Sequence, residues 1–346
     1  MSKRKKVAVI IPYFGSFPNY FDYWLKSALT NKDFDFLIFT DNLNYKTQGN
    51  VHFINMSFSE FRELVQKQVE FKICLKDPYK ICDYRPVFGS ALKDYLVNYD
   101  FWGFGDVDVI LGDLSHFITP EILDNYDKIY ELGHLTLLRN NDKCNNLWKI
   151  KHHLKNAYRY DEAFKTPYPC HFDETDGLTQ IAKLENIKIY SKVDFADIDR
   201  SKFNFVPLGK QHKVVPSLFL WKNGKLLYYF KDKNRISMYE VAYAHFQKRQ
   251  MEIPNKSDNV AYFDIIPNKF INDEVPEKYL EKIKVISNYP YYKYNRRKEI
   301  ISKLKKNALQ QRIYRMLFKR INRVILDRRE GKVNIYVSYK IKRPIR

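Results

Sequence analysis

Asp106 and Asp108 are the residues of this chain whose type and spacing best suit metal chemistry. They lie in an apolar, aromatic stretch, residues 99–110, that is typical of a buried strand. At the frayed end of a strand, residues i and i+2 point the same way, so two carboxylates can contact one hard cation. Such a cation can neutralise a diphosphate leaving group. The alternative is a solvated acidic turn, but charges in so apolar a stretch are costly without a partner.

A histidine followed by two cations forms a second cluster, within residues 243–249. An imidazole added to two carboxylates makes a reasonable Mn²⁺ site, with His245 as the third ligand. Lys248 or Arg249 could contact a diphosphate as its negative charge grows. The alternative for His245 is a purely structural role.

The third cluster is the acidic segment 171–177, which leads into a predicted helix at 178–184. Helix capping and the helix dipole would explain acidic residues there. The alternative is a carboxylate aimed at a reacting sugar or its acceptor. An inverting transfer needs a base for the acceptor hydroxyl, whereas a retaining transfer needs a group on the opposite face of the sugar. Asp173 or Glu174 could serve in either.

These clusters require a scaffold, and the pattern along the chain predicts an α/β fold with a mostly parallel sheet. The predicted helices cover 21–31, 57–68 and 86–96, and the predicted strands cover 6–12, 34–40, 51–55, 131–139, 187–190 and 218–230, the last with a hairpin turn at Asn223-Gly224. Ligands of such sheets bind beyond the carboxyl ends of the strands. Residues 12–14, 40–42 and 106–108 should therefore converge on one cleft.

Composition bounds the class of protein. The 346 residues are 45% hydrophobic and 16% aromatic, enough for a sizeable core, which we place within residues 1–290. The four cysteines form no C-x-x-C pair and indicate a reducing, cytoplasmic compartment. No stretch is apolar for long enough to predict a membrane span or a signal peptide.

The remaining segment, 291–346, is strongly basic. Residues 293–346 hold nineteen lysines and arginines against three acidic residues, which is +16 of the total +20. Apolar residues recur there at three- and four-residue steps and predict basic amphipathic helices. We expect an anchor on the anionic inner leaflet. The alternative is a helix docked on the main domain with its charges solvated. Nucleic-acid binding is disfavoured, since no recognised module with stacking aromatics is present.

Several motifs resemble those of bacterial GT-A-type glycosyltransferases from capsule and lipopolysaccharide gene clusters, over roughly residues 5–250. They are KVAVIIPYFG, FTDN, KICDYRP at 80–86, YDFWGFGDVDVILGDL at 99–114, HFDE and YAHFQKR. The resemblance implies a GT-A-like single Rossmann-type nucleotide-binding domain. It also implies a UDP-sugar donor and a divalent cation, Mn²⁺ or Mg²⁺.

The resemblance further implies roles for individual residues. Pro12, Tyr13 and Asp41 would line the nucleotide pocket. The ribose and the metal would be held by Asp106 and Asp108, the metal shell would be completed by His245, and the diphosphate would face Lys248. Arg85 would lie near the donor, with a structural ion pair near Asp83 as the alternative. HFDE is similar to a segment of retaining galactosyl- and N-acetylgalactosaminyltransferases. That similarity favours retention, with Glu174 near the anomeric carbon and galactose as the sugar.

We therefore expect a metal-dependent transferase that moves a hexose from a UDP-sugar to a growing surface polysaccharide or lipid-linked glycan. It would be peripheral on the cytoplasmic face of the inner membrane. One alternative is a non-catalytic scaffold of polysaccharide assembly. Another is a sugar nucleotidyl- or phosphotransferase, against which stands the single glycine, Gly15, after the first predicted strand.

Overall fold

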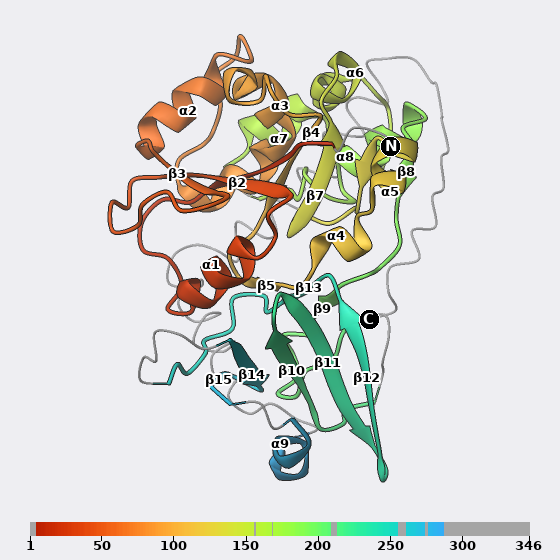
Figure 1. Ribbon diagram of the computed structural model, residues 1–346. Coiled ribbons are helices and arrows are strands. Elements are labelled where there is room, and N and C mark those ends of the chain that lie inside the picture. The colour runs from red at the N-terminus through yellow and green to blue at the C-terminus, as the bar shows by residue number, and fades with distance from the viewer. Residues whose placement is uncertain are drawn as a thin grey trace, which may run out of the picture.

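The computed structural model describes residues 5–155, 157–167, 169–208, 213–254, 261–273 and 276–286. Its largest sheet has seven strands in the order β3-β2-β1-β4-β7-β6-β8 (Figure 1). Strands β3, β2, β1 and β4 run parallel, β7 is antiparallel to both β4 and β6, and β6 is parallel to β8. The strands are β1 (Val7–Pro12), β2 (Phe34–Thr40), β3 (Val51–Asn55), β4 (Phe101–Gly105), β6 (Lys128–Ile129), β7 (Leu135–Arg139) and β8 (Ile189–Tyr190). The predicted α/β class with a mostly parallel sheet is confirmed.

The central strands are apolar on both faces because each face has its own core. Along β1, Ala8 and Ile10 enter one core, while Val9 and Ile11 enter the other. The first core is built with α2 (Phe58–Gln66), α3 (Phe88–Ala91), α6 (Asp142–Asn145), α7 (Tyr160–Lys165) and α8 (Leu178–Leu184). The second is built with α1 (Phe21–Leu29), α4 (Leu114–Phe117) and α5 (Pro120–Asn125). Such two-sided burial is what a parallel sheet requires.

Two helix predictions had different outcomes. The helix expected at 57–68 is α2, and its Ser57 and Glu60 form a capping box that satisfies backbone N–H groups at the helix start. The helix expected at 86–96 is confirmed only in part, because only Phe88–Ala91 is α-helical. The chain instead forms a 3-10 helix, η1 (Pro78–Val87), then the short α3 and a second 3-10 turn, η2 (Lys93–Tyr95). Buried polar contacts of Lys80 and Asp83, described below, hold η1 just before this region.

The segment 218–230 does form a hairpin, but it does not continue the main sheet as expected. Asn223 and Gly224 have φ of 51° and 82°, and they join β10 (Ser217–Lys222) to β11 (Lys225–Asp232). These strands belong to a separate antiparallel sheet, completed by β12 (Arg235–Val241), β14 (Tyr262–Ile266) and β15 (Lys269–Ile271). Its aromatic side chains pack into a third core of their own, and α9 (Pro276–Lys282) contacts β10 and β11.

A small sheet lies between the two large ones in Figure 1 and consists of β5 (Val109–Leu111), β13 (Tyr243–His245) and β9 (Ala196–Asp197). In its register His245 lies opposite Val109 on one side and Asp197 on the other. This pairing brings the region after β4 next to a histidine far along the chain.

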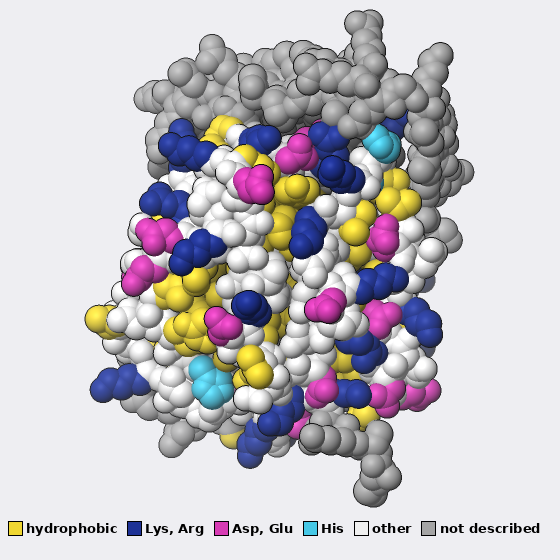
Figure 2. All heavy atoms as spheres, turned by 90° about the horizontal axis from the view of Figure 1, so that it is seen from above, with side chains coloured by type: hydrophobic (Ala, Val, Ile, Leu, Met, Phe, Trp, Pro, Cys, Tyr) yellow, Lys and Arg dark blue, Asp and Glu magenta, His cyan; other side chains and the backbone are white. Residues whose placement is uncertain are grey.

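The basic segment 291–346, for which amphipathic helices are predicted, lies outside the described residues. Within the described ranges, no helix is both long and apolar enough to cross a bilayer. On the face shown in Figure 2, Lys and Arg side chains intermingle with Asp and Glu side chains.

Candidate active site

A cavity of about 810 Å³ opens where the ends of β1 and β4 meet the small sheet. Its lining comes from seven stretches of the chain and includes Pro12, Tyr13, Phe14, Tyr79, Arg85, Asp106, Asp108, His134, Asp173, Glu174, Asp197, His245, Gln247 and Lys248. Two of the three predicted strand ends thus converge. The third does not, since no residue of 40–42 lines the cavity, and the Asp41 carboxylate accepts a hydrogen bond from the backbone N–H of Gly15 at 2.7 Å. Nucleotide binding by Asp41 stays a prediction.

Three predicted metal ligands lie together. The ligand atoms of Asp106, Asp108 and His245 are all within 4.8 Å of one another. Asp108 directs Oδ1 toward His245 Nε2 at 3.5 Å, and its Oδ2 accepts the backbone N–H of Lys248 at 2.8 Å. Two carboxylates with one imidazole fit Mn²⁺ well. These three residues therefore form a possible cation site.

The same contacts set the protonation of the group. Burial would raise the pKa of Asp108, but its contacts with His245 and Lys248 lower it to about 2. Burial would lower the pKa of His245, but the carboxylates of Asp108 and Asp197 raise it to about 10. Without a cation, His245 is an imidazolium at neutral pH. A metal ion would displace its proton and take over the charge balance.

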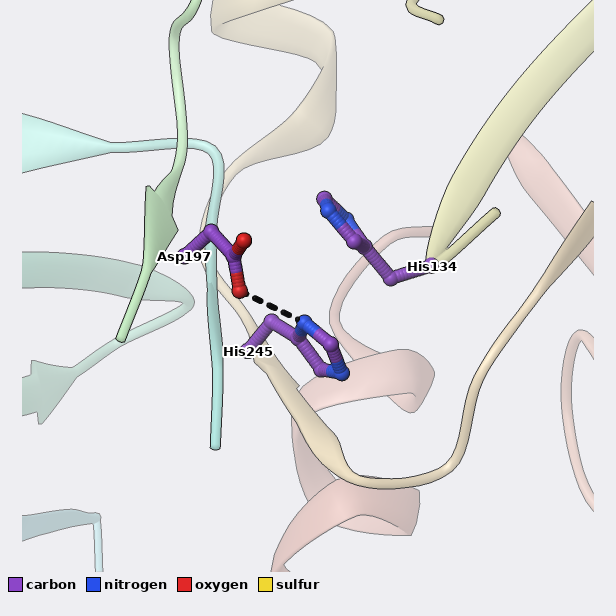
Figure 3. A group of neighbouring side chains, drawn as sticks. All are labelled: His134, Asp197 and His245. Atoms are coloured by element: carbon purple, nitrogen blue, oxygen red, sulfur yellow. Dashed lines mark hydrogen bonds and ion pairs between the residues drawn. The ribbon is translucent and has the colours of Figure 1, made fainter. Parts of the chain in front are cut away.

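Two residues that sequence reasoning missed surround His245 (Figure 3). Asp197 accepts the Nδ1–H of His245 at 2.8 Å. His134 stacks on His245 with ring centroids 4.5 Å apart, and its Nδ1 lies 2.8 Å from the Tyr243 hydroxyl. Burial and the charge of His245 lower the pKa of His134 to about 3, so this ring is neutral. His134, Asp197 and His245 are a second group whose ligand atoms lie within 4.8 Å of one another.

Arg85 joins the predicted metal group to the predicted catalytic carboxylates. Its guanidinium forms an ion pair with Asp106, and it donates to Asp173 and to the Gly133 carbonyl, each at 2.9 Å. The alternative of an ion pair near Asp83 is not what the structure shows. Arg85 therefore lies inside the cavity, between two acidic clusters.

Asp83 instead supports the loop that carries the catalytic candidates. Its carboxylate pairs with Lys80 and accepts the backbone N–H groups of Cys170 at 2.7 Å and Phe172 at 2.9 Å. The side chains of these four residues are all buried. Asp83 and Lys80 of the KICDYRP segment thus tie η1 to the loop before α8 through buried contacts.

Asp173 and Glu174 follow directly after this hydrogen-bonded loop and lie at the cavity wall. Helix capping does not account for them, because α8 begins after Gly177 with no side-chain capping bond. Asp173 is 1% exposed. Burial raises the pKa of its carboxyl group to about 7, although the nearby charge of Arg85 acts in the opposite direction. Burial also raises the pKa of Glu174, whose Oε1 accepts the Gly133 N–H at 3.0 Å. Perturbed carboxyl groups in a cavity are typical of catalytic sites.

Of the two candidate cations, Lys248 is the one in position. Its Nζ lies 3.8 Å from the centre of the Tyr79 ring, at the cavity wall. The Arg249 guanidinium donates to the backbone carbonyls of Asp199, Lys202 and Phe203, so it braces a loop. Tyr13, which also lines the cavity, stacks on Phe17 with ring centroids 4.9 Å apart.

Known proteins add distant likenesses. The galactosyltransferase LgtC, crystallised with donor and acceptor sugar analogs, is 12% identical over 55% of this chain and 75% of that chain, with a TM-score of 0.30. The glycosyltransferase GlyE of Streptococcus pneumoniae TIGR4 is 12% identical over 55% of this chain and 46% of that chain, with a TM-score of 0.31. An active-site mutant of LgtC is 11% identical over 69% and 87%, with a TM-score of 0.34. No residue role in this chain rests on them.

A search of curated proteins finds no match. One family model does match, over residues 9–274, which is most of the chain and includes every element of the cavity. Its description is "Family of unknown function (DUF6625)". The chain belongs to this family.

Proposed function

We propose that the protein is a metal-dependent glycosyltransferase with a GT-A-like architecture. It moves a hexose, galactose in preference, from a UDP-sugar to a growing surface polysaccharide or a lipid-linked glycan. The observation that carries the proposal is one cavity that holds a possible cation site, Asp106, Asp108 and His245, and two carboxyl groups with raised pKa, the buried Asp173 and the half-buried Glu174. The cavity thus offers candidate groups both for the leaving diphosphate and for the transferred sugar.

The cation half would bind the nucleotide. Asp106, Asp108 and His245 would hold Mn²⁺ or Mg²⁺, which when bound supplies Lewis-acid stabilisation to a diphosphate leaving group. Tyr13, at the end of β1, offers a ring for the base, with Pro12 beside it. Lys248 is an exposed cation in the cavity lining and would contact the diphosphate.

The carboxyl half would face the transferred sugar. Arg85 holds one oxygen of Asp173, and the other oxygen of this buried carboxyl has no hydrogen-bond partner among the described residues. A sugar hydroxyl in the cavity would satisfy it, as buried polar atoms require. Glu174 lies beside it and is fixed through Gly133. We assign Glu174 the place near the anomeric carbon in a retaining transfer, with a base in an inverting transfer as the alternative.

Two other functions use the same features. A scaffold of polysaccharide assembly would keep the fold without turnover. A sugar nucleotidyl- or phosphotransferase would also need paired aspartates and a cation, but after β1 the chain has Gly15 and no further glycine in the loop that follows. The raised pKa of Asp173 favours a site that handles protons or sugar hydroxyls over a scaffold.

The proposed location follows from the basic segment. Residues 293–346 would bind the anionic cytoplasmic face of the inner membrane, which suits an acceptor on a lipid carrier. The rest of the chain would remain in the cytoplasm.

Turnover of a panel of nucleotide-sugars with Mn²⁺ tests the proposal. Release of UDP from one donor, abolished by a chelator and by Asp108→Asn, is the expected result. The exposed Asp142, outside the cavity, gives a matched control, and Asp142→Asn should turn over like the parent. Pyrophosphate as the product would establish a nucleotidyltransferase. Wild-type activity in a folded Asp108→Asn protein would remove the mechanism.

A further inference from the structure

His245 belongs to both groups of possible metal ligands, one with Asp106 and Asp108 and one with His134 and Asp197. We propose that Asp197 is a positioning residue, which holds His245 as a ligand for a cation at Asp106 and Asp108 and does not bind that cation itself. The inference rests on the proposed function and adds to it the residue that organises its cation site.

The two nitrogens of His245 have different neighbours. Nδ1–H donates to Asp197 Oδ1 at 2.8 Å, while Nε2 faces Asp108 Oδ1 at 3.5 Å. A metal-bound histidine coordinates through one nitrogen and donates its other N–H to a carboxylate or carbonyl, which fixes the tautomer and the ring orientation. Asp197 occupies that place. When a cation removes one proton, the bond to Asp197 retains the proton on Nδ1 and leaves the Nε2 lone pair for the metal.

The backbone makes this arrangement rigid. Asp197 and His245 lie directly opposite each other in the parallel pair of β9 and β13. Both side chains are mostly buried, with 15% and 14% of their surface exposed. The carboxylate therefore has little freedom to turn away from the ring.

Asp197 also holds the turn that carries the proposed diphosphate ligand. The same Oδ1 accepts a hydrogen bond from the Gln247 amide at 2.7 Å. Gln247 and Lys248 have φ of 51° and 60°, a left-handed conformation that residues other than glycine seldom adopt. The Lys248 N–H donates to Asp108 at 2.8 Å. Asp197 and Asp108 thus hold this turn from two sides, which places the Lys248 side chain at the cavity.

The competing reading makes Asp197 a ligand together with His134. A cation bound to an imidazole lies in the plane of the ring, at a nitrogen. His134 has a buried Nε2 with no hydrogen-bond partner among the described residues, but the ring lies over the face of His245, with ring planes 29° apart, and its Nδ1 is engaged by the Tyr243 hydroxyl. A ring stacked on the face is poorly placed to share an in-plane cation. We therefore assign His134 the role of a packing partner.

Mn²⁺ binding to the full chain tests the inference without a turnover assay. Electron paramagnetic resonance measures the dissociation constant, and spin-echo modulation detects a directly coordinated ¹⁴N. The parent should bind one Mn²⁺ with one coordinated imidazole. Asp197→Ala should weaken Mn²⁺ binding by about 10- to 100-fold and lose the ¹⁴N signal. Asp197→Asn keeps an acceptor for Nδ1–H and should retain the ¹⁴N signal, with a smaller loss of affinity.

The controls separate the possible failures. Asp199→Asn, two residues away and bonded to the Ser201 N–H, should bind Mn²⁺ like the parent. Unchanged affinity and ¹⁴N signal in Asp197→Ala, while Asp108→Asn abolishes binding, would overturn the positioning role alone. Equal losses in Asp197→Asn, Asp197→Ala and His134→Phe would make Asp197 a ligand of the second group. Mn²⁺ binding that does not depend on Asp108 would overturn both the inference and the proposed function.

A second variant covers a folding failure of Asp197→Ala. Gln247→Ala leaves the bond between Asp197 and His245 in place but releases the turn. The ¹⁴N signal should persist, and the dissociation constant for UDP in the presence of Mn²⁺ should rise several-fold. A Gln247→Ala protein that binds UDP as tightly as the parent would contradict the role of Asp197 in the turn.

Discussion

The guanidinium of Arg85 forms an ion pair with Asp106, the first aspartate of the predicted cation pair. Asp106 thus belongs to the proposed metal group and also pairs with Arg85, which in turn pairs with Asp173. The two halves of the cavity are therefore coupled through one side chain. Any change at Arg85 should alter both nucleotide binding and the environment of the buried carboxyl.

Replacement of Arg85 tests this coupling. Arg85→Ala should lower the free energy of unfolding by about 3 kcal/mol, because removal of one partner leaves the Asp173 carboxyl buried without its cation. Arg85→Lys should also be damaging, since a single ammonium cannot reproduce a fork that contacts two carboxylates. Urea denaturation and UDP binding would measure the two effects.

A double variant supplies the control for Arg85. Asp173→Asn removes the charge that Arg85 compensates, so Arg85→Ala should cost less stability in that background. Additive losses would show that the two residues are not coupled.

The buried Asp173 carboxyl should make stability depend on pH. An aspartate in the unfolded chain titrates near a pKa of about 4, whereas the pKa of Asp173 in the folded protein is about 7. Between these values the folded state binds more protons, so this group lowers the free energy of unfolding as the pH rises from about 4 to about 7. Asp173→Asn should remove that decline. Thermal melts of parent and variant at pH 5 and pH 8 would measure it, and an identical pH profile would contradict the assignment.

Lys128 should act in the opposite direction. Its side chain is fully buried in β6, and burial lowers its pKa to about 7. The unfolded state then binds more protons between pH 7 and about pH 10, so stability rises with pH in that range. Lys128→Met should stabilise the protein most below pH 7, where the parent buries a charge, and should flatten the rise. Melting temperatures at pH 6 and pH 9 give the comparison, with Lys149→Met on the exposed surface as control.

Gly133 is required by the close approach of the acidic cluster. A Cβ at this position would lie 2.6 Å from Asp173 Oδ2 and 2.8 Å from Glu174 Oε1. Gly133→Ala should therefore cost about 1–3 kcal/mol of stability through overpacking and abolish UDP-sugar turnover by displacing both carboxyl groups. Gly224→Ala, in the hairpin turn with φ of 82°, is a control that should destabilise the fold but leave donor binding intact. Equal turnover in the two variants would contradict this role for Gly133.

Sequence reasoning could find the groups with strong local signals. The apolar runs of β1 and β2 and the Ser57 capping box follow from residue type and spacing. The meeting of Asp106 with His245 was expected from the family resemblance, because the two residues lie far apart in the sequence. Asp197 had no such signal. It lies 48 positions before His245 in the sequence and meets it only because the two-residue strand β9 pairs with β13. The η1 backbone was also out of reach, since buried contacts of Lys80 and Asp83 determine it. The local pattern at 218–230 specified a hairpin but not the sheet that it joins.

The basic segment 293–346 is expected to attach the protein to an anionic membrane. Deletion of residues 293–346 removes +16 of the formal charge, and each Lys or Arg near an anionic leaflet contributes about 1 kcal/mol of attraction. The parent should co-sediment with vesicles that contain phosphatidylglycerol and should be released by high salt, whereas the truncated chain should stay in the supernatant. Binding of UDP and Mn²⁺ should be unchanged, because the cavity is built from residues before 251. Vesicle binding that survives the deletion would refute the anchor, and loss of UDP binding would instead indicate that the segment packs on the main domain.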